Sequence, residues 1–211
     1  MKLFSREEIK MKVLILGGFL GSGKTSALIQ LARYIARDAK PDDKNPKVVI
    51  LENEIGEVGV DDKVLASGGY KVDSLFQGCA CCTMSGEVAM NVMTIRNDLN
   101  PEWLVIEATG VAYPEKIKES IQAIPDIEIR LTALTDAKRW KRLLIPMQNL
   151  IRDQLHGAET ILVNKIDLVD EEMLNFVEDS VRGFNPDAQI FKITTTQEVD
   201  VNVWKAVLGE E

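Results

Sequence analysis

A glycine-rich segment that ends in a lysine and a threonine is the part of the sequence best suited to chemistry. Residues 18–25 read GFLGSGKT, which matches the phosphate-binding pattern G-x-x-x-x-G-K-[ST]. Glycines let the backbone curl until successive N–H groups point at phosphate oxygens, and a helix that begins there adds its positive dipole end. An ordinary glycine-rich turn is the structural alternative, but the lysine–threonine pair favours a nucleotide site.

Two residues at the end of this segment have a specific expected role. Lys24 would reach the β- and γ-phosphates, and the Thr25 hydroxyl would ligate Mg²⁺. The residues expected to bind the nucleotide here are Gly21, Ser22, Gly23, Lys24, Thr25 and Ser26.

A glutamate at the end of an apolar run is the candidate partner of that magnesium. Glu107 follows residues 103–106 (WLVI). In P-loop proteins an acidic residue at the end of such a hydrophobic strand holds Mg²⁺ directly or through water. Gly110 could then place its backbone N–H against the γ-phosphate, so that residues 109–110 begin a loop that senses the nucleotide. We assign Lys24 and Glu107 to catalysis by positioning and charge neutralisation. A strand-capping acid followed by a turn glycine is the structural alternative.

A second motif predicts which base is bound. Residues 164–167 read NKID, the N-K-x-D pattern by which P-loop GTPases recognise guanine. The Asp167 carboxylate can accept from guanine N1–H and the 2-amino group together, a donor pair that adenine lacks, and we expect it to be buried. We therefore assign Asn164, Lys165 and Asp167 to the nucleotide site, although an Asn- and Asp-rich turn at a strand end is common.

Three cysteines within four positions form the other unusual cluster. Cys79, Cys81 and Cys82 bring soft ligands close together, and thiolates select Zn²⁺ or another transition metal. Three thiolates lack a fourth tetrahedral ligand, which Glu54, Glu57 or water could supply. Two alternatives stay open: buried cysteines acting as small apolar side chains, and a redox pair of the C-x-x-C type.

The elements that must position these motifs alternate between strands and helices. Hydrophobic periodicity predicts strands over 12–16, 47–51, 70–76, 103–106, 127–134, 161–163 and 189–194, and helices over 24–38, 85–99, 115–123, 143–155, 171–182 and 201–208. This alternation predicts an α/β fold with a mostly parallel central sheet, helices on both faces and ligands at the carboxyl ends of the strands. We expect a polar N-terminal arm over residues 1–11 and one P-loop domain over residues 12–211.

Composition narrows the class of function. The chain has 211 residues, 45% of them hydrophobic and 27% charged, and a formal net charge of −8. This charge argues against a general nucleic-acid or membrane-surface role, because no basic excess exists to neutralise phosphates. No apolar run is long enough for a membrane span, and the N-terminus is too polar for a signal peptide. We therefore expect a cytoplasmic protein with reduced thiols.

Weaker features have plain interpretations. We expect the methionines at 84, 90 and 93 to pack in the core and His156 to be a capping or surface residue at a helix end. The basic run at Lys138, Arg139, Lys141 and Arg142 is interpreted as a solvated helix start, with a partner or phosphate contact as the alternative.

Five segments occur in an order that resembles the CobW branch of the CobW/HypB/UreG family of GTPases: GGFLGSGKT, ENEIGEVGVD, GCACC, IEATG and NKID. The resemblance covers residues 11 to about 208. It implies a GTPase that couples its nucleotide state to metal delivery, and it carries Glu54 and Glu57 to a switch segment that links metal and nucleotide. Many such proteins continue into a C-terminal domain and a histidine-rich tract, which this sequence does not show.

The hypothesis is therefore a slow, Mg²⁺-dependent GTPase that acts as a metal chaperone or as a maturation factor for a metal- or cobalamin-dependent enzyme. The expected partners are a client metalloenzyme or metal acceptor and a second copy of the chain in a nucleotide-dependent homodimer. One alternative is a GTP-dependent conformational chaperone for a corrinoid enzyme without metal transfer. The other is a small-molecule kinase, which leaves NKID and GCACC unexplained.

Overall fold

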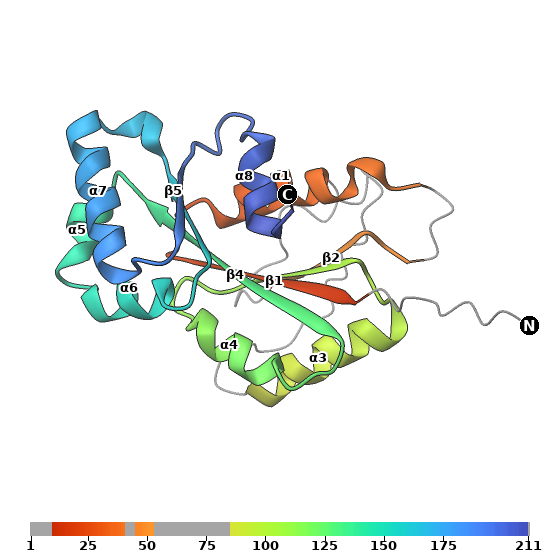
Figure 1. Cartoon of the computed structure of the whole chain (residues 1–211). Helices are drawn as coiled ribbons and strands as arrows, with labels where there is room; N and C mark the ends of the chain where they lie inside the picture. Colours follow the sequence, from red (N-terminus) through yellow and green to blue (C-terminus); the bar gives the residue numbers. More distant parts are fainter. Residues whose placement is uncertain (1–9, 41–44, 53–84, 211) are drawn as a thin grey trace, which may run out of the picture.

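Apolar segments of the chain pair into one parallel sheet (Figure 1). The computed structural model describes residues 10–40, 45–52 and 85–210. Within them the six strands are β1 (Met11–Gly18), β2 (Val48–Glu52), β3 (Trp103–Glu107), β4 (Ile127–Asp136), β5 (Thr160–Asn164) and β6 (Gln189–Lys192). Their order is β2-β3-β1-β4-β5-β6, and every pairing is parallel. The predicted fold class is confirmed.

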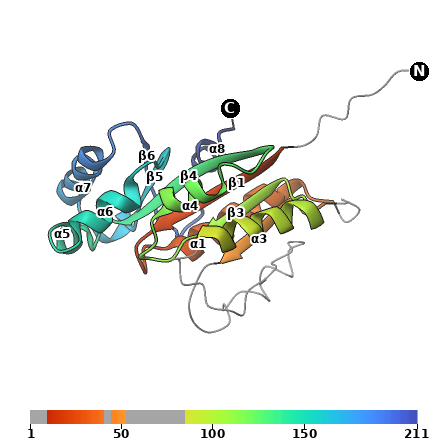
Figure 2. The same ribbon diagram turned by 90° about the horizontal axis from the view of Figure 1, so that it is seen from below.

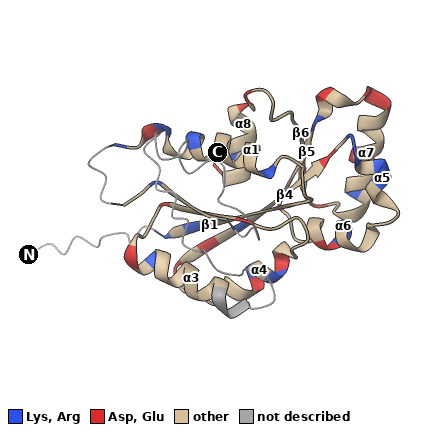
Figure 3. Cartoon of the chain, turned by 180° about the vertical axis from the view of Figure 1, so that it is seen from behind, with Lys and Arg blue, Asp and Glu red and all other residues tan. Residues whose placement is uncertain are grey.

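Helices connect the strands and cover both faces of the sheet, as Figures 1 and 2 show from two directions. They are α1 (Lys24–Ile35), α3 (Ser85–Asp98), α4 (Pro114–Ile121), α5 (Trp140–Leu144), α6 (Gln148–Leu155), α7 (Glu171–Phe184) and α8 (Val201–Leu208). Two short 3₁₀ turns, η1 (Ala36–Asp38) and η2 (Ile166–Leu168), follow α1 and β5. Charged residues gather on these outer elements, with basic residues on α5 and acidic ones at the start of α7 (Figure 3).

The central strand divides the core between the two faces. Successive side chains of a strand point to opposite faces. Val13 and Ile15 of β1 accordingly pack in the cluster beneath α3, α4, α6 and α7. Leu14 and Leu16 pack in the other cluster, beneath α1 and α8. Because β1 is covered on both faces, its sequence is a continuous apolar run rather than an alternating one.

One predicted helix proves to be two. The expected helix over 143–155 is wrong as a single element, since α5 ends at Leu144 and α6 begins at Gln148. Pro146 lies between them; it has no N–H to donate and disfavours helical backbone at the residue before it. The predicted strand over 189–194 also ends early, at Lys192.

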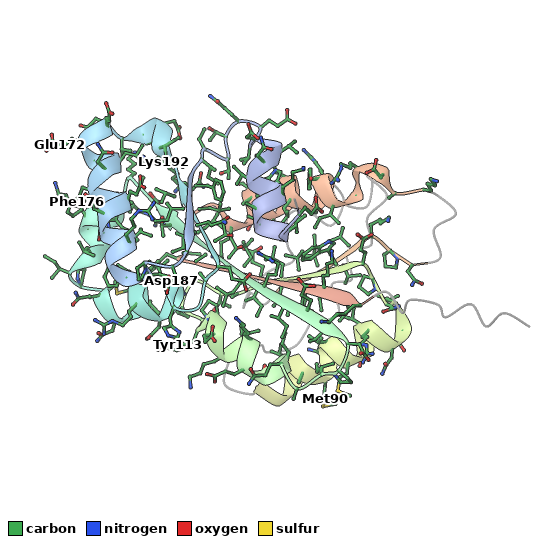
Figure 4. The ribbon with its side chains drawn as sticks, in the orientation of Figure 1. Met90, Tyr113, Glu172, Phe176, Asp187 and Lys192 are labelled. Atoms are coloured by element: carbon green, nitrogen blue, oxygen red, sulfur yellow. The ribbon has the colours of Figure 1, made fainter. Side chains whose placement is uncertain are left out.

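The methionines predicted to pack in the core are exposed where the structure describes them. Met90 is 68% and Met93 is 49% exposed, and Met90 lies on the outer side of α3 (Figure 4). The helical spacing is correct, but Val92 and Ile95 occupy the buried face of α3. His156 is exposed at the end of α6, as expected.

Some predictions concern residues that the structure does not describe. Met84 and the weak strand over 70–76 lie outside the described residues, as does most of the N-terminal arm. In the described ranges no helix combines the length and apolar character needed to cross a bilayer.

Two isoleucines provide a test of this core. Ile15 is fully buried in the central strand, whereas Ile145 is 87% exposed between α5 and α6. We expect Ile15→Ala to lower the free energy of unfolding by roughly 2–5 kcal/mol, because the lost methyl groups leave a cavity. Ile145→Ala should change it by no more than about 0.5 kcal/mol. Urea denaturation measures both, and equal effects would contradict the assignment of the core.

Candidate nucleotide-binding site

The predicted site residues that the structure describes meet at the carboxyl ends of four neighbouring strands. The phosphate-binding loop follows β1, Glu107 ends β3, and Asn164 ends β5. Asp136, which the sequence did not single out, ends β4 between them. The strand register aligns these positions, because Leu16 of β1 pairs with Glu107. Carboxyl ends of parallel strands are where α/β proteins bind ligands.

The phosphate-binding loop has a backbone that its glycines permit. Gly23 has φ +100° and stands immediately before α1, and a Cβ there would overlap the Asn164 amide. Lys24, the first residue of the helix, folds back over the loop; its Nζ donates to Gly18 O at 3.0 Å and to Phe19 O at 3.3 Å. The start of α1 thus lies against a lysine ammonium, an arrangement that suits a phosphate group.

The predicted magnesium ligands lie side by side. Thr25 Oγ1 donates to Glu107 Oε1 at 3.2 Å, which joins the start of α1 to the end of β3. Glu107 is only 9% exposed, whereas Thr25 and Ser26 are exposed. A hydroxyl and a carboxylate are the hard oxygen donors that Mg²⁺ prefers, so the donor set fits this ion.

Gly110 approaches the phosphate-binding loop closely. A Cβ at Gly110 would lie 2.5 Å from the backbone nitrogen of Leu20, so only glycine fits there. Gln154 of α6 holds the same segment, because its Nε2 donates to Gly110 O at 3.2 Å and to Ala112 O at 2.9 Å. The segment after β3 is therefore in contact with the loop, as a nucleotide-sensing segment requires.

Asn164 links the NKID segment to the phosphate-binding loop. This fully buried side chain donates from Nδ2 to Ser22 O at 2.7 Å and to Thr195 Oγ1 at 3.1 Å. Its Oδ1 accepts from Lys165 N at 2.8 Å and from Thr195 N at 3.0 Å. Asn164 therefore fixes the loop to two other segments and acts from beneath it.

Lys165 also acts on the phosphate-binding loop. It has a left-handed backbone conformation, with φ +65°. Its Nζ donates to Gly21 O at 2.6 Å and to Asp136 Oδ2 at 2.7 Å. The lysine thus lies across the loop, with its charge balanced by the carboxylate at the end of β4.

Asp167 departs from the expectation of a buried carboxylate. It lies in η2, beyond the end of β5, and is exposed. Its Oδ1 accepts from Thr194 Oγ1 at 2.5 Å. The Asp167 carboxylate therefore remains hydrated in the protein alone, and an unpaired buried carboxylate does not disfavour adenine as expected. Thr194 and Thr195 were not predicted as site residues and belong to the segment after β6; Thr194 was predicted as the last residue of that strand.

Asp136 and Arg139 are the functional candidates that the sequence analysis did not assign. Asp136 is 3% exposed and accepts from Arg139 N at 3.1 Å, Arg139 Nε at 2.7 Å and Lys165 Nζ at 2.7 Å. Burial raises the pKa of the Asp136 carboxyl, but the hydrogen bonds from Lys165 and Arg139 and the charge of Lys165 outweigh it and hold the pKa below the usual value. The expected solvated helix start is thus wrong for Arg139, which contacts the phosphate-binding loop.

The predicted transition-metal ligands fall outside the described residues: Glu54, Glu57, Cys79, Cys81 and Cys82. Within the described ranges, no group of three or more His, Cys, Asp or Glu side chains is placed to hold a metal ion.

A second concave region lies away from this chemistry. An open depression of about 930 Å³ is lined by residues around the amino ends of β5 and β6 and the end of α8. Arg130, one of its basic residues, is paired with Glu159 at 3.1 Å and donates to Val207 O. None of the predicted site residues lines it, so the nucleotide chemistry belongs to the opposite edge of the sheet.

The buried carboxylate of Asp136 leads to a stability prediction. We expect Asp136→Asn to lower the free energy of unfolding by roughly 1–3 kcal/mol at pH 7, because it removes the charge that two half-exposed cations share. The folded-state pKa lies below the usual 3.8, so this stabilisation is complete above 3.8 and is lost as the pH falls through the folded value.

Urea denaturation of both proteins at pH 7 and near the folded-state pKa measures the difference. Glu178→Gln is the control: it removes a carboxylate that pairs with Arg182 and Lys192 at the surface, and we expect a loss within about 1 kcal/mol. A gap between wild type and Asp136→Asn that widens toward acid pH would contradict the assignment.

The chain is similar in sequence to known proteins. The zinc chaperone YeiR of Escherichia coli (strain K12) is 33% identical over 166 residues, which cover 75% of this chain and 47% of YeiR. The zinc-regulated GTPase metalloprotein activator 1 of Dictyostelium discoideum is 26% identical, over 89% of this chain and 46% of that protein. This chain therefore spans about half the length of these two relatives.

Solved structures show the same fold. The Zn(II)-bound YjiA GTPase of E. coli aligns with a TM-score of 0.61 at 21% identity, over 94% of this chain and 62% of YjiA. HypB of Helicobacter pylori, solved with nickel, aligns with a TM-score of 0.59 at 18% identity, over 94% of this chain and 83% of HypB. The CobW/HypB/UreG nucleotide-binding domain matches residues 12–192. The chain belongs to this family.

Proposed function

We propose that the chain is a Mg²⁺-dependent GTPase whose nucleotide state is coupled to the handling of a transition metal, with zinc favoured. The observation that supports this most is the connection between two motifs far apart in sequence. Asn164 and Lys165 of the NKID segment hold successive carbonyls of the phosphate-binding loop. A phosphate site and a guanine site built from the same contacts are what a GTPase needs. Family membership and a relative named as a GTPase add to this support.

In the proposed reaction, water attacks the γ-phosphorus and the bond to the β–γ bridging oxygen breaks, giving GDP and phosphate. The loop amides and the Lys24 ammonium hold the phosphates in place and balance their charge. Thr25 and Glu107 would hold Mg²⁺, which neutralises charge on the β- and γ-phosphates when bound. The chain thus contributes position and charge, and we expect slow turnover because the described residues include no glutamine assigned to orient water.

The metal is the proposed cargo. Two relatives carry the names zinc chaperone and zinc-regulated GTPase metalloprotein activator. For this chain we propose Cys79, Cys81 and Cys82 as the metal ligands, with Glu54 or Glu57 completing the site. Thiolates are ligands that Zn²⁺ prefers, whereas Mg²⁺ and Ca²⁺ prefer oxygen ligands.

The proposed partners receive that cargo or complete the site. The first is a client metalloenzyme or metal acceptor, with a cobalamin-dependent enzyme as one class, and the second is another copy of the chain in the GTP state. Exposed apolar side chains beside the site support a partner-binding role. Val111 follows Gly110 and is 68% exposed, and Tyr113, near the start of α4, is 48% exposed (Figure 4).

Base selection can be tested at one carboxylate. We expect the wild-type chain to hydrolyse GTP slowly and to prefer it to ATP. Asp167→Ala should reduce that preference roughly 10- to 100-fold, because the hydrogen bonds to guanine N1–H and N2 are lost. Glu172→Ala, at an exposed position at the start of α7, is the control and should leave the preference unchanged. Equal kcat/KM for GTP and ATP in the wild type would refute the guanine assignment.

Metal coupling can be tested by titration in two nucleotide states. We expect about one equivalent of Zn²⁺ to bind and the Cys81→Ala/Cys82→Ala double variant to lose that site. The Zn²⁺ affinity should differ between GDP and a non-hydrolysable GTP analogue, since coupled delivery requires differential affinity. His156→Ala, which removes the sole histidine of the sequence, is the control and should bind Zn²⁺ normally. Equal affinity in both states would favour the conformational chaperone without metal transfer.

A further inference from the structure

The phosphate-binding loop is held from outside by three side chains rather than by the NKID pair alone. Arg139 Nη2 donates to Leu20 O at 2.5 Å. The next two carbonyls along the loop accept from Lys165 and Asn164, as described above. Arg139 comes from the connection between β4 and α5 and belongs to no motif of the sequence.

Asp136 fixes the direction of the Arg139 side chain. It accepts from the backbone nitrogen of Arg139 at 3.1 Å and from its Nε at 2.7 Å, so both the backbone and the guanidinium group of Arg139 are held. The guanidinium group is planar and rigid. Once Nε is bonded to Asp136, the direction in which Nη2 donates toward Leu20 is set. An exposed cation, with a side chain 39% accessible, is thus ordered by a carboxylate that is almost completely buried.

The consequence for the loop follows from peptide geometry. In a trans peptide the C=O of one residue and the N–H of the next point in opposite directions. The described residues contain no cis peptide bond. When Arg139 holds Leu20 O on the outer side, the Gly21 N–H is turned to the other side of that peptide. In a loop that binds phosphate with its amides, an N–H held away from the carbonyl's donor is available to an anion.

We propose that Arg139, oriented by Asp136, is a positioning residue for the phosphate-binding loop, holding the Leu20–Gly21 peptide so that its N–H faces the phosphates of a guanine nucleotide. This rests on the proposed function, because it takes the nucleotide to bind at this loop. The contribution is specific to the phosphates. The base is held by a different group, Asp167, which Arg139 does not contact in the described hydrogen bonds.

The experiment compares ligands with and without phosphates. We expect Arg139→Gln to weaken GDP binding about tenfold, as for one charge-assisted hydrogen bond, and to leave guanosine binding unchanged. Arg139→Lys keeps the charge but has one ammonium, which lacks the planar fork that bonds Asp136 and Leu20 at fixed angles, so it should not restore affinity. Arg142→Gln removes a nearby exposed charge and is the matched control, with GDP affinity unchanged.

Calorimetry or NMR titration supplies the affinities, and thermal unfolding of each variant confirms folding. GDP affinity at the wild-type level in both Arg139 variants would overturn the proposal, as would equal losses for GDP and guanosine. If Arg139→Gln does not fold, the Arg139→Lys result decides. Lys24→Ala separates a failure of the proposed nucleotide site from a failure of the positioning role. If Lys24→Ala binds GDP normally, the nucleotide site has been misplaced. If Lys24→Ala loses GDP affinity but the Arg139 variants do not, only the positioning role is refuted.

Discussion

The structure depends on one geometric constraint: in a trans peptide, an N–H that faces an anion leaves the carbonyl of the same peptide pointing the other way, where it needs its own donor. Backbone carbonyls are strong acceptors, and a carbonyl at an exposed position that no protein group reaches bonds to water instead. Here three consecutive carbonyls accept from arginine, lysine and asparagine side chains, and two carbonyls earlier in the loop accept from Lys24. The loop is therefore stabilised by donors from other elements before any ligand contact is considered.

The parallel sheet is what brings these donors within reach. Strand register places Asp136 of β4 directly beside Asn164 of β5 and Glu107 of β3 beside Leu16 of β1. Since all the strands run in the same direction, the polar residue that ends each strand lies at one edge. Asp136 is central to this edge because Arg139 and Lys165, which approach the loop from different connections, share its carboxylate. Removing one partner from such a group is costly, because it leaves a buried charge without compensation.

Sequence reasoning identified the parts of this site whose chemistry follows local spacing. Three of these parts lie directly after an apolar run: the glycine-rich loop, Glu107 and NKID. Predicting the strands was therefore enough to place them. Arg139 and Thr194 are different, because their roles arise from contacts with residues 119 and 27 positions away in the chain. The exposure of Met90 was missed because periodicity gives the spacing of a helical face but does not say which face is covered. The break at Pro146 was missed because the apolar spacing was followed without weighing the proline, which interrupts a helix locally.

A crystal structure of the chain with GDP and Mg²⁺ tests most directly how the peptides of the phosphate-binding loop are oriented. We predict that the Gly21 and Gly23 N–H groups donate to phosphate oxygens while Arg139, Lys165 and Asn164 keep their bonds to the carbonyls of Leu20, Gly21 and Ser22. A diphosphate bound elsewhere on the sheet, or a loop whose carbonyls leave these three side chains on binding, would contradict the account.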